Sequence, residues 1–264
     1  MSNCLRGKQM YPILFEFDGF QVRSYGVIVG LSFLLALWMS TREAERKGVD
    51  PKLIQDFSIY ALLAGVVGAR LYFVLFSAPA YFLEHPREVF AIWNGGMGII
   101  GSLIGGLLVA VWFCRQNNIP LLKLADALAP GMALGQTTGQ LACLLNGDSY
   151  GRPTDLPWAI TFTDPRSIAP LNIPLHPIEL YEMVAYFLVF LLVWKMRKHY
   201  RTDGFAFFTY CAAYGVARFI VDFFRGDPAM FAWGIQAAQL FGVAMIVASS
   251  IGFLLLKKDL RFAS

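Results

Sequence analysis

Charged residues are scarce in this chain, since Asp, Glu, Lys and Arg together make up only 15% of its 264 residues. Hydrophobic residues make up 57%, which is more than one globular core of this length requires. The net charge is +4, but the basic residues are scattered among apolar stretches and form no stripe or tail. This composition indicates a membrane protein and argues against a nucleic-acid partner.

Cysteine and histidine are also few. The four cysteines, Cys4, Cys114, Cys143 and Cys211, are far apart with no CxxC motif, and no histidine stands at metal-ligand spacing. The sequence therefore implies neither a disulfide framework nor a metal site, and we expect no cofactor. Internal repeats, low-complexity tracts and linkers are absent from it as well, which predicts a single domain over residues 1–264.

Seven stretches approach the roughly 20 apolar residues that a transmembrane helix needs. The fourth is the most polar, since it carries Asp126, Pro130 and several amide and hydroxyl side chains. Such a stretch must face protein or a water-filled cavity. We predict an all-α, polytopic integral membrane protein with seven spans, at about residues 22–40, 56–76, 97–113, 123–145, 178–196, 205–223 and 236–256.

The basic residues of the connecting segments predict the orientation. With the C-terminus in the cytoplasm, segments 41–55, 114–123, 195–204 and 257–264 lie inside and hold thirteen of the 22 Lys and Arg. This bias agrees with the positive-inside rule. The N-terminus is then external, and the two longest loops, at about residues 77–96 and 146–177, form a small external cap.

The sixth stretch carries a polar stripe on an otherwise apolar helix. In YGVARFIVDFFRGD, Tyr214, Arg218, Asp222 and Arg225 stand at i, i+4, i+8 and i+11, along one helical face. Charges inside a bilayer are costly, so they are paired, turned inward or functional. One interpretation is an ion pair between Arg218 and Asp222. The other is an anion site, in which Arg218 neutralises a lipid phosphate and Asp222 orients the guanidinium.

Arg70 in the second stretch and the glycines of the third stretch each allow two interpretations. Arg70, in GVVGARLYFVLF, either extends toward the headgroup region or supplies a second guanidinium to the phosphate site. Gly65 and Gly68 before it suit close helix packing. The glycines of GGMGIIGSLIGG suit packing as well, or the approach of a lipid headgroup to the backbone.

Two motifs flank the long segment 146–177. CLLNGDSYGRPTD predicts that the fourth helix ends in a turn at Asn146-Gly147. HPIELYE predicts a helix start, with Glu179 and Glu182 at its positive end, and on this pattern alone His176 is a helix-start residue. Tyr25 stands at the entrance of the first span, where an interfacial tyrosine is ordinary.

In this order, the motifs SYG, GARLYFVLF, GGM...GSLIG, NGDSYGRPTD, HPIELYE and YGVARFIVDFFRGD resemble the prolipoprotein diacylglyceryl transferase family, over about residues 22–256. The resemblance implies an enzyme of the bacterial inner membrane, with its cap in the periplasm. Its substrates would be phosphatidylglycerol and prolipoprotein signal peptides with a lipobox cysteine. The diacylglyceryl group would pass to the cysteine thiol, with release of glycerol phosphate.

The resemblance also implies roles for individual residues. Arg218 matches an essential arginine of the family, and Asp222 matches the acidic residue that follows it. The chemistry of the reaction, rather than the resemblance, adds that an acidic or histidine side chain near the outer face accepts the thiol proton, and Asp148 and His176 are the candidates. The implied substrate-binding residues are Tyr25, Arg70, Gln140, Asn146, Gly151 and Tyr214.

Two positions depart from the family pattern. Gln140 stands where the family has a phospholipid-binding arginine, and a glutamine cannot neutralise phosphate. Ile100 stands where the family often has histidine. These departures leave open a non-catalytic relative that binds phospholipid or lipoprotein. The lack of a repeat in the sequence opposes a small transporter, and its scattered acidic residues oppose a metal-dependent phosphatidyl transferase.

Overall fold

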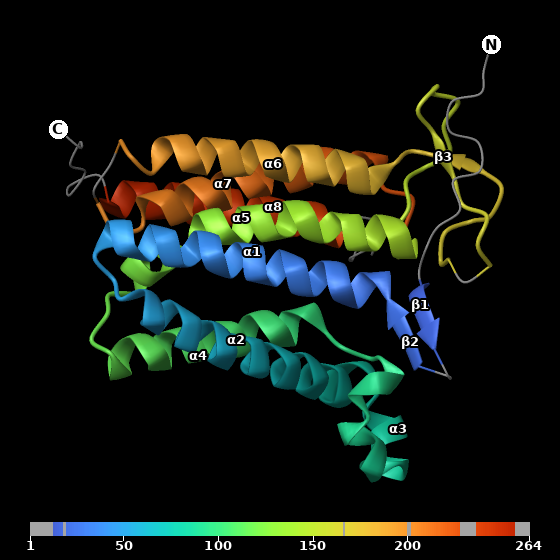
Figure 1. Ribbon diagram of the computed structural model, residues 1–264, viewed down its shortest axis with the longest axis horizontal. Helices are drawn as coiled ribbons and strands as arrows, with labels where there is room; N and C mark the ends of the chain where they lie inside the picture. The colour runs from blue at the N-terminus through green and yellow to red at the C-terminus, as the bar shows by residue number, and fades with distance from the viewer. Residues whose placement is uncertain (1–12, 18–19, 166, 200–201, 228–235, 257–264) are drawn as a thin grey trace. The chain divides into compact units, whose positions relative to one another are not determined.

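Seven long helices dominate the computed structural model, which describes residues 13–17, 20–165, 167–199, 202–227 and 236–256 (Figure 1). Each coincides with one predicted stretch, so the expected all-α, polytopic fold is confirmed. The predicted cytoplasmic tail, 257–264, lies outside the described residues. The helices are α1 (Ser24–Lys47), α2 (Pro51–Tyr72), α4 (Ile99–Gln116), α5 (Leu121–Asn146), α6 (Ile178–Met196), α7 (Phe205–Val221) and α8 (Ala237–Leu256).

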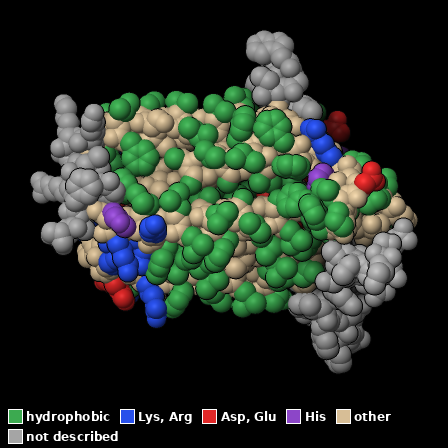
Figure 2. Space-filling model, turned by 90° about the horizontal axis from the view of Figure 1, so that it is seen from above, with side chains coloured by type: hydrophobic (Ala, Val, Ile, Leu, Met, Phe, Trp, Pro, Cys, Tyr) green, Lys and Arg blue, Asp and Glu red, His purple; other side chains and the backbone are tan. Residues whose placement is uncertain are grey.

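The surfaces of these helices suit a hydrocarbon environment. Leu63 of α2, Leu107 of α4, Leu188 of α6 and Leu254 of α8 are all at least 59% exposed. Figure 2 shows hydrophobic side chains over much of the visible face. Large continuous apolar surfaces are rare on soluble proteins. Five helices, α1, α2, α4, α7 and α8, are long and apolar enough to cross a membrane, and spanning by α5 and α6 stays a prediction.

Residues 44–124 form one compact unit around the pair α2 and α4. Gly68 and Gly101 face each other, and a Cβ atom on either would overlap the carbonyl oxygen of the other. Ser102 Oγ donates to the Gly65 carbonyl oxygen at 2.8 Å. The packing interpretation of these glycines is therefore confirmed. Between the helices lie η1 (Phe73–Ser77), α3 (Pro79–Glu84), η2 (Pro86–Phe90) and η3 (Ile92–Asn94).

Residues 1–43 and 125–264 contribute a second compact unit. Its described part begins with an antiparallel hairpin, β1 (Ile13–Phe17) and β2 (Phe20–Arg23), which the sequence analysis did not predict. Small residues again allow close packing, since Gly215 of α7 and Gly242 of α8 leave no room for a Cβ atom on either. A buried cluster joins α5, α6 and α7 through Ala129, Ala133, Val189, Val193, Ala206, Tyr210 and Cys211.

The segment between α5 and α6 has its own small core. The helix ends at the predicted turn, where Gly147 has a φ of 68°, a conformation that suits glycine. Two short strands, β3 (Ile160–Thr161) and β4 (Pro174–Leu175), then pair antiparallel. Phe162, Ala169 and Leu175 are buried together beneath them. Tyr150 and Ile160 pack against this core.

Asp126, in the most polar predicted stretch, caps the N-terminus of α7 with its carboxylate. Asp126 is fully buried, as expected for a polar stretch turned away from lipid. Its carboxylate accepts from the backbone N–H groups of Gly204 at 2.9 Å and Phe207 at 2.8 Å, which lie at the cap and in the first turn of α7. The side chain of one helix therefore caps another.

Replacing Asp126 by alanine is expected to lower the stability of the folded protein by about 1–3 kcal/mol, because two backbone donors would stay buried without an acceptor. The measurement is the thermal unfolding midpoint in detergent micelles. Asp126→Asn, which keeps one amide oxygen, should lose less. An unchanged midpoint for the alanine variant would show that this cap does not stabilise α7.

Candidate active site

The central feature of the polar stripe is an ion pair between two helices. Arg218 of α7 donates from Nη1 to Glu182 Oε1 of α6, and the same nitrogen lies 3.2 Å from the Tyr186 hydroxyl. The Glu182 side chain is 3% exposed and that of Arg218 19% exposed. A carboxylate and a guanidinium thus neutralise each other at the edge of the helix bundle, where one of them is still accessible.

Of the two interpretations of the polar stripe, the ion pair between Arg218 and Asp222 is wrong. Asp222 opens η4 (Asp222–Phe224), the short 3-10 helix that follows α7, and it is 2% exposed. With its amide nitrogen turned toward the carboxylate, Gln236 lies 2.6 Å from Asp222 Oδ2. The other oxygen, Oδ1, has no hydrogen-bond partner within the described residues. The physical reason is that the carboxylate of Glu182, on the neighbouring helix α6, binds the Arg218 guanidinium in place of Asp222.

The end of α7 is joined to the loop that follows α5. Arg225 pairs with Gly151 as in an antiparallel sheet, and the Gly226 N–H donates to the Tyr150 carbonyl oxygen at 2.9 Å. The Arg152 N–H donates to the Phe224 carbonyl oxygen, also at 2.9 Å. Gly151 has no room for a side chain, because a Cβ atom there would overlap the backbone oxygen of His176. This explains in physical terms why glycine is required at position 151.

Two carboxylates lie near the segment between α5 and α6: Asp148 in the loop that follows α5, and Glu179 in the first turn of α6. Asn146 Nδ2 donates to Asp148 Oδ1 at 2.5 Å, so two of the predicted site residues are in direct contact. Ser149 Oγ donates to Glu179 Oε1 at 3.3 Å, and Glu179 is fully buried. The loop is therefore bonded through Asp148 to the end of α5 and through Ser149 to the first turn of α6.

His176 is held in place by its neighbours. Its Nδ1 lies 3.1 Å from the Tyr181 hydroxyl, and its ring stacks edge-on against Phe224, with ring centres 5.3 Å apart. The backbone N–H of His176 donates to the Arg152 carbonyl oxygen at 3.0 Å. The imidazole is therefore packed among aromatic rings beside the loop that contains Gly151.

Tyr25, Gln140 and Tyr214 belong to the same unit as Arg218. Tyr25 is 38% exposed at the start of α1, close enough to Cys143 and Asp148 to interact electrostatically with both. The buried Gln140 Oε1 has no hydrogen-bond partner within the described residues. The Tyr214 ring packs against that of Tyr186, with centres 5.2 Å apart. Tyr214 is thus placed beside the partner of Arg218.

Arg70 belongs to the unit of residues 44–124 and is bound there to backbone oxygens. It donates from Nε to Val89 at 2.8 Å, from Nη1 to Gly95 at 2.6 Å and from Nη2 to Glu88 at 2.6 Å. A fourth bond, from Nη1 to Gly96, measures 3.0 Å. Arg70 is only 7% exposed, so its guanidinium is enclosed by these backbone groups. These bonds tie segment 88–96 to α2, and Ile100, 49% exposed, follows that segment in α4.

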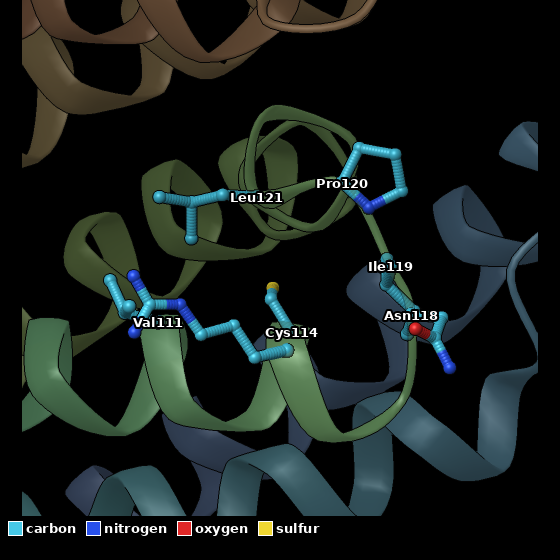
Figure 3. A pocket seen from close by; sticks show the side chains of 7 residues that line it. Val111, Cys114, Asn118, Ile119, Pro120 and Leu121 are labelled. Carbon is cyan, nitrogen blue, oxygen red and sulfur yellow. The ribbon is translucent and has the colours of Figure 1, made fainter.

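Two hollows of the surface contain little or no charge. One, of about 690 Å³, lies at the turn between α4 and α5, where Cys114, Asn118 and Leu121 line it beside Arg115 (Figure 3). The other, of about 750 Å³, is an apolar groove whose lining includes Leu188, Val216 and Phe253. Within the part of the chain that the structure describes, no group of three or more His, Cys, Asp or Glu could hold a metal ion.

Two residues that contact Arg218 or its partner, Glu182 and Arg225, were not predicted as site residues. Arg225 Nη1 lies 3.2 Å from Glu182 Oε1, the oxygen that also accepts from Arg218. Both residues were visible in the motifs, but Glu182 was interpreted as a helix-start charge. The signal that identifies Glu182 is a carboxylate inside a predicted membrane span, 178–196, because such a charge requires a positive partner.

Comparisons with known proteins show the family of this chain. The family model described as prolipoprotein diacylglyceryl transferase matches residues 12–255. A phosphatidylglycerol–prolipoprotein diacylglyceryl transferase of Geobacter sulfurreducens is 38% identical over 223 residues, 83% of each chain. The enzyme of the same name from Bordetella avium is 32% identical over 259 residues, 95% of this chain and 96% of the relative. The chain therefore belongs to the prolipoprotein diacylglyceryl transferase family.

Proposed function

We propose that this protein transfers the diacylglyceryl group of phosphatidylglycerol to the thiol of the lipobox cysteine in prolipoproteins. The sulfur forms a thioether bond to the glyceryl carbon, the bond from that carbon to the phosphate oxygen breaks, and glycerol phosphate leaves with the electron pair. The observation that carries this proposal is Arg218, a partly exposed guanidinium at the end of a membrane helix in a chain of this family.

Arg218 stabilises the leaving phosphate. A guanidinium offers five N–H donors in a fixed fork that matches two phosphate oxygens. Negative charge grows on the phosphate oxygen as its bond to carbon breaks, so a cation already in position lowers the barrier. Asp222, buried one turn further along the chain, orients this end of α7 through its contact with Gln236. Arg70 is left out of the phosphate site, because its donors are occupied by backbone oxygens.

The thiol must lose its proton, because a thiol of pKa about 8.5 is mostly protonated at neutral pH and the thiolate is the nucleophile. Asp148 and His176 stay the candidates for the acceptor. Asp148 is held by Asn146, and His176 by Tyr181. Both lie in the unit that contains Arg218, on the segments that join α5 and α6.

Five further residues contact the substrate or shape its site: Tyr25, Gln140, Asn146, Gly151 and Tyr214. Tyr25 and Asn146 lie beside Asp148, and Gly151 allows the loop to meet the end of α7. Gln140 offers hydrogen bonds but no charge to the phospholipid. The signal peptide with its lipobox cysteine enters from the same side as the lipid headgroup.

The protein lies in the inner membrane, with its N-terminus in the periplasm and its C-terminus in the cytoplasm. Loops 77–96 and 146–177 then form the periplasmic cap. The end of α7 and the start of α6, which carry Arg218 and Glu182, are joined to segment 146–177. This topology places the phosphate site at the outer leaflet, where the thiol of an exported lipoprotein is available.

Complementation tests the proposal against the non-catalytic alternative that Gln140 and Ile100 leave open. A strain depleted of its own transferase is given the gene for this chain, and the diacylglyceryl modification of a reporter lipoprotein is followed by mass spectrometry. We expect modification and growth. A protein that reaches the membrane in normal amount, yet leaves the reporter unmodified, would support a binding function instead.

A further inference from the structure

Two arginines converge on one oxygen of Glu182. Arg218 and Arg225 both donate from Nη1 to Glu182 Oε1, so their guanidinium groups lie side by side. Two like charges this close repel strongly where water is largely excluded. The buried carboxylate between them offsets that repulsion. The three side chains therefore form a preassembled unit, which we call the arginine pair and its counter-ion.

Both guanidinium groups keep N–H donors that no described residue accepts. Arg218 uses Nη1, and Arg225 uses Nη1 and also Nε, which donates to Asp227 at 3.0 Å. Within the described residues, Nε and Nη2 of Arg218 and Nη2 of Arg225 have no acceptor, and none of these atoms is sealed in the interior. The two side chains are 19% and 17% exposed. The pair can therefore bind an anion without losing its counter-ion.

The backbone holds Arg225 rigidly at the loop of the site. Its pairing with Gly151, and the bonds on either side of it, attach it to residues 150–152. Cys143 lies within electrostatic range of Arg225 and Asp148, one turn along α5 from Gln140. A positive charge is thus present near the part of α5 that carries the uncharged Gln140.

We propose that Arg225 is a second phosphate-binding residue of this protein, and that Glu182 is a positioning residue that keeps Arg218 and Arg225 in register for one phosphate group. The inference rests on the proposed function, since the anion is the phosphodiester of the lipid substrate. Two guanidinium groups that approach one phosphate from adjacent directions fix the orientation of the phosphate and also neutralise its charge. Glu182 touches neither substrate and acts only through the arginines.

The test for Arg225 compares Arg225→Gln and Arg225→Lys in the full-length protein. Transfer to a lipobox peptide is measured in mixed micelles over a range of phosphatidylglycerol fractions. Because a charge-assisted hydrogen bond is lost, we expect KM for the lipid to rise about 10- to 100-fold in Arg225→Gln, and less in Arg225→Lys, which keeps the charge without the fork. Arg115→Gln, a change of an exposed arginine in α4, should match wild type.

A wild-type KM in Arg225→Gln overturns the role of Arg225. If Arg225→Gln fails to assemble, Arg225→Lys decides alone, since it must still show a raised KM. The proposed function fails in a different way, because wild-type protein would then form no product at any lipid fraction.

The test for Glu182 separates positioning from folding. In Glu182→Gln, the two guanidinium groups lose the charge that holds them together, and we expect kcat per folded molecule to fall about tenfold or more, with partial recovery in Glu182→Asp. KM for the lipid should change less than kcat, because both positive charges remain. A wild-type kcat in Glu182→Gln, or equal losses in Glu182→Asp and Glu182→Gln, would overturn the positioning role.

Discussion

Replacing Arg218 by alanine is expected to reduce diacylglyceryl transfer by a factor on the order of 10²–10³ or more, the usual loss when a group that stabilises developing charge is removed. Arg218 is bound to Glu182 and Tyr186 through one nitrogen, which leaves the rest of its fork for the phosphate. The loss should appear mainly in kcat, because the interaction strengthens as the leaving group becomes charged. The measurement is the initial rate of adduct formation on a lipobox peptide.

Arg218→Lys and Arg115→Ala are the matched controls for this prediction. Lysine keeps the positive charge but lacks the two parallel N–H donors of a guanidinium, so Arg218→Lys should recover part of the lost rate. Arg115 lies exposed in the other compact unit, and its removal should leave the rate unchanged. Transfer at the wild-type rate by folded Arg218→Ala protein would remove this residue from the mechanism.

Gly151→Ala is expected to lower both stability and activity, although it adds only one methyl group. The new Cβ atom would overlap the backbone oxygen of His176, and the facing Gly226 leaves the loop no room to retreat. Overpacking of this kind typically costs about 1–3 kcal/mol. The movement would also separate the loop from Arg225, so we expect a loss of activity of about tenfold or more in the molecules that remain folded.

The unfolding midpoint and the specific activity of folded protein are measured together for this variant. Gly106→Ala is the matched control, because a Cβ atom at Gly106 of α4 meets nothing within 4 Å. Alanine favours a helix over glycine, so this control should be neutral or slightly stabilising. Wild-type behaviour of Gly151→Ala would mean that residues 151, 176 and 225 are not as tightly packed as the structure indicates.

The helices of this fold could be predicted because each needs a long apolar run, and a run of that length has few alternatives. The ends were less accurate: α1 extends to Lys47, beyond the predicted end near residue 40, because the amphipathic residues that follow continue the helix. The hairpin of β1 and β2 was missed, since its strands are short and interrupted by charges.

The site was predictable in part. The helical spacing of the polar stripe identified Arg218 and placed Arg225 on the same face, but the partner of Arg218 was assigned within its own helix. Sequence spacing gives contacts along a helix, whereas the observed partner, Glu182, comes from α6 through tertiary packing. Arg70 shows the same limit, because its acceptors are backbone oxygens of residues 88–96, which leave no mark in the sequence.

The most direct test of the account is transfer in vitro by the purified protein. Phosphatidylglycerol-containing micelles and a lipobox peptide are incubated with wild type and with Arg218→Ala, and the peptide adduct and released glycerol phosphate are quantified. The account predicts both products in equal amounts from wild type, and their loss in the variant. Folded wild-type protein that forms neither product, beside an active control enzyme, would contradict it.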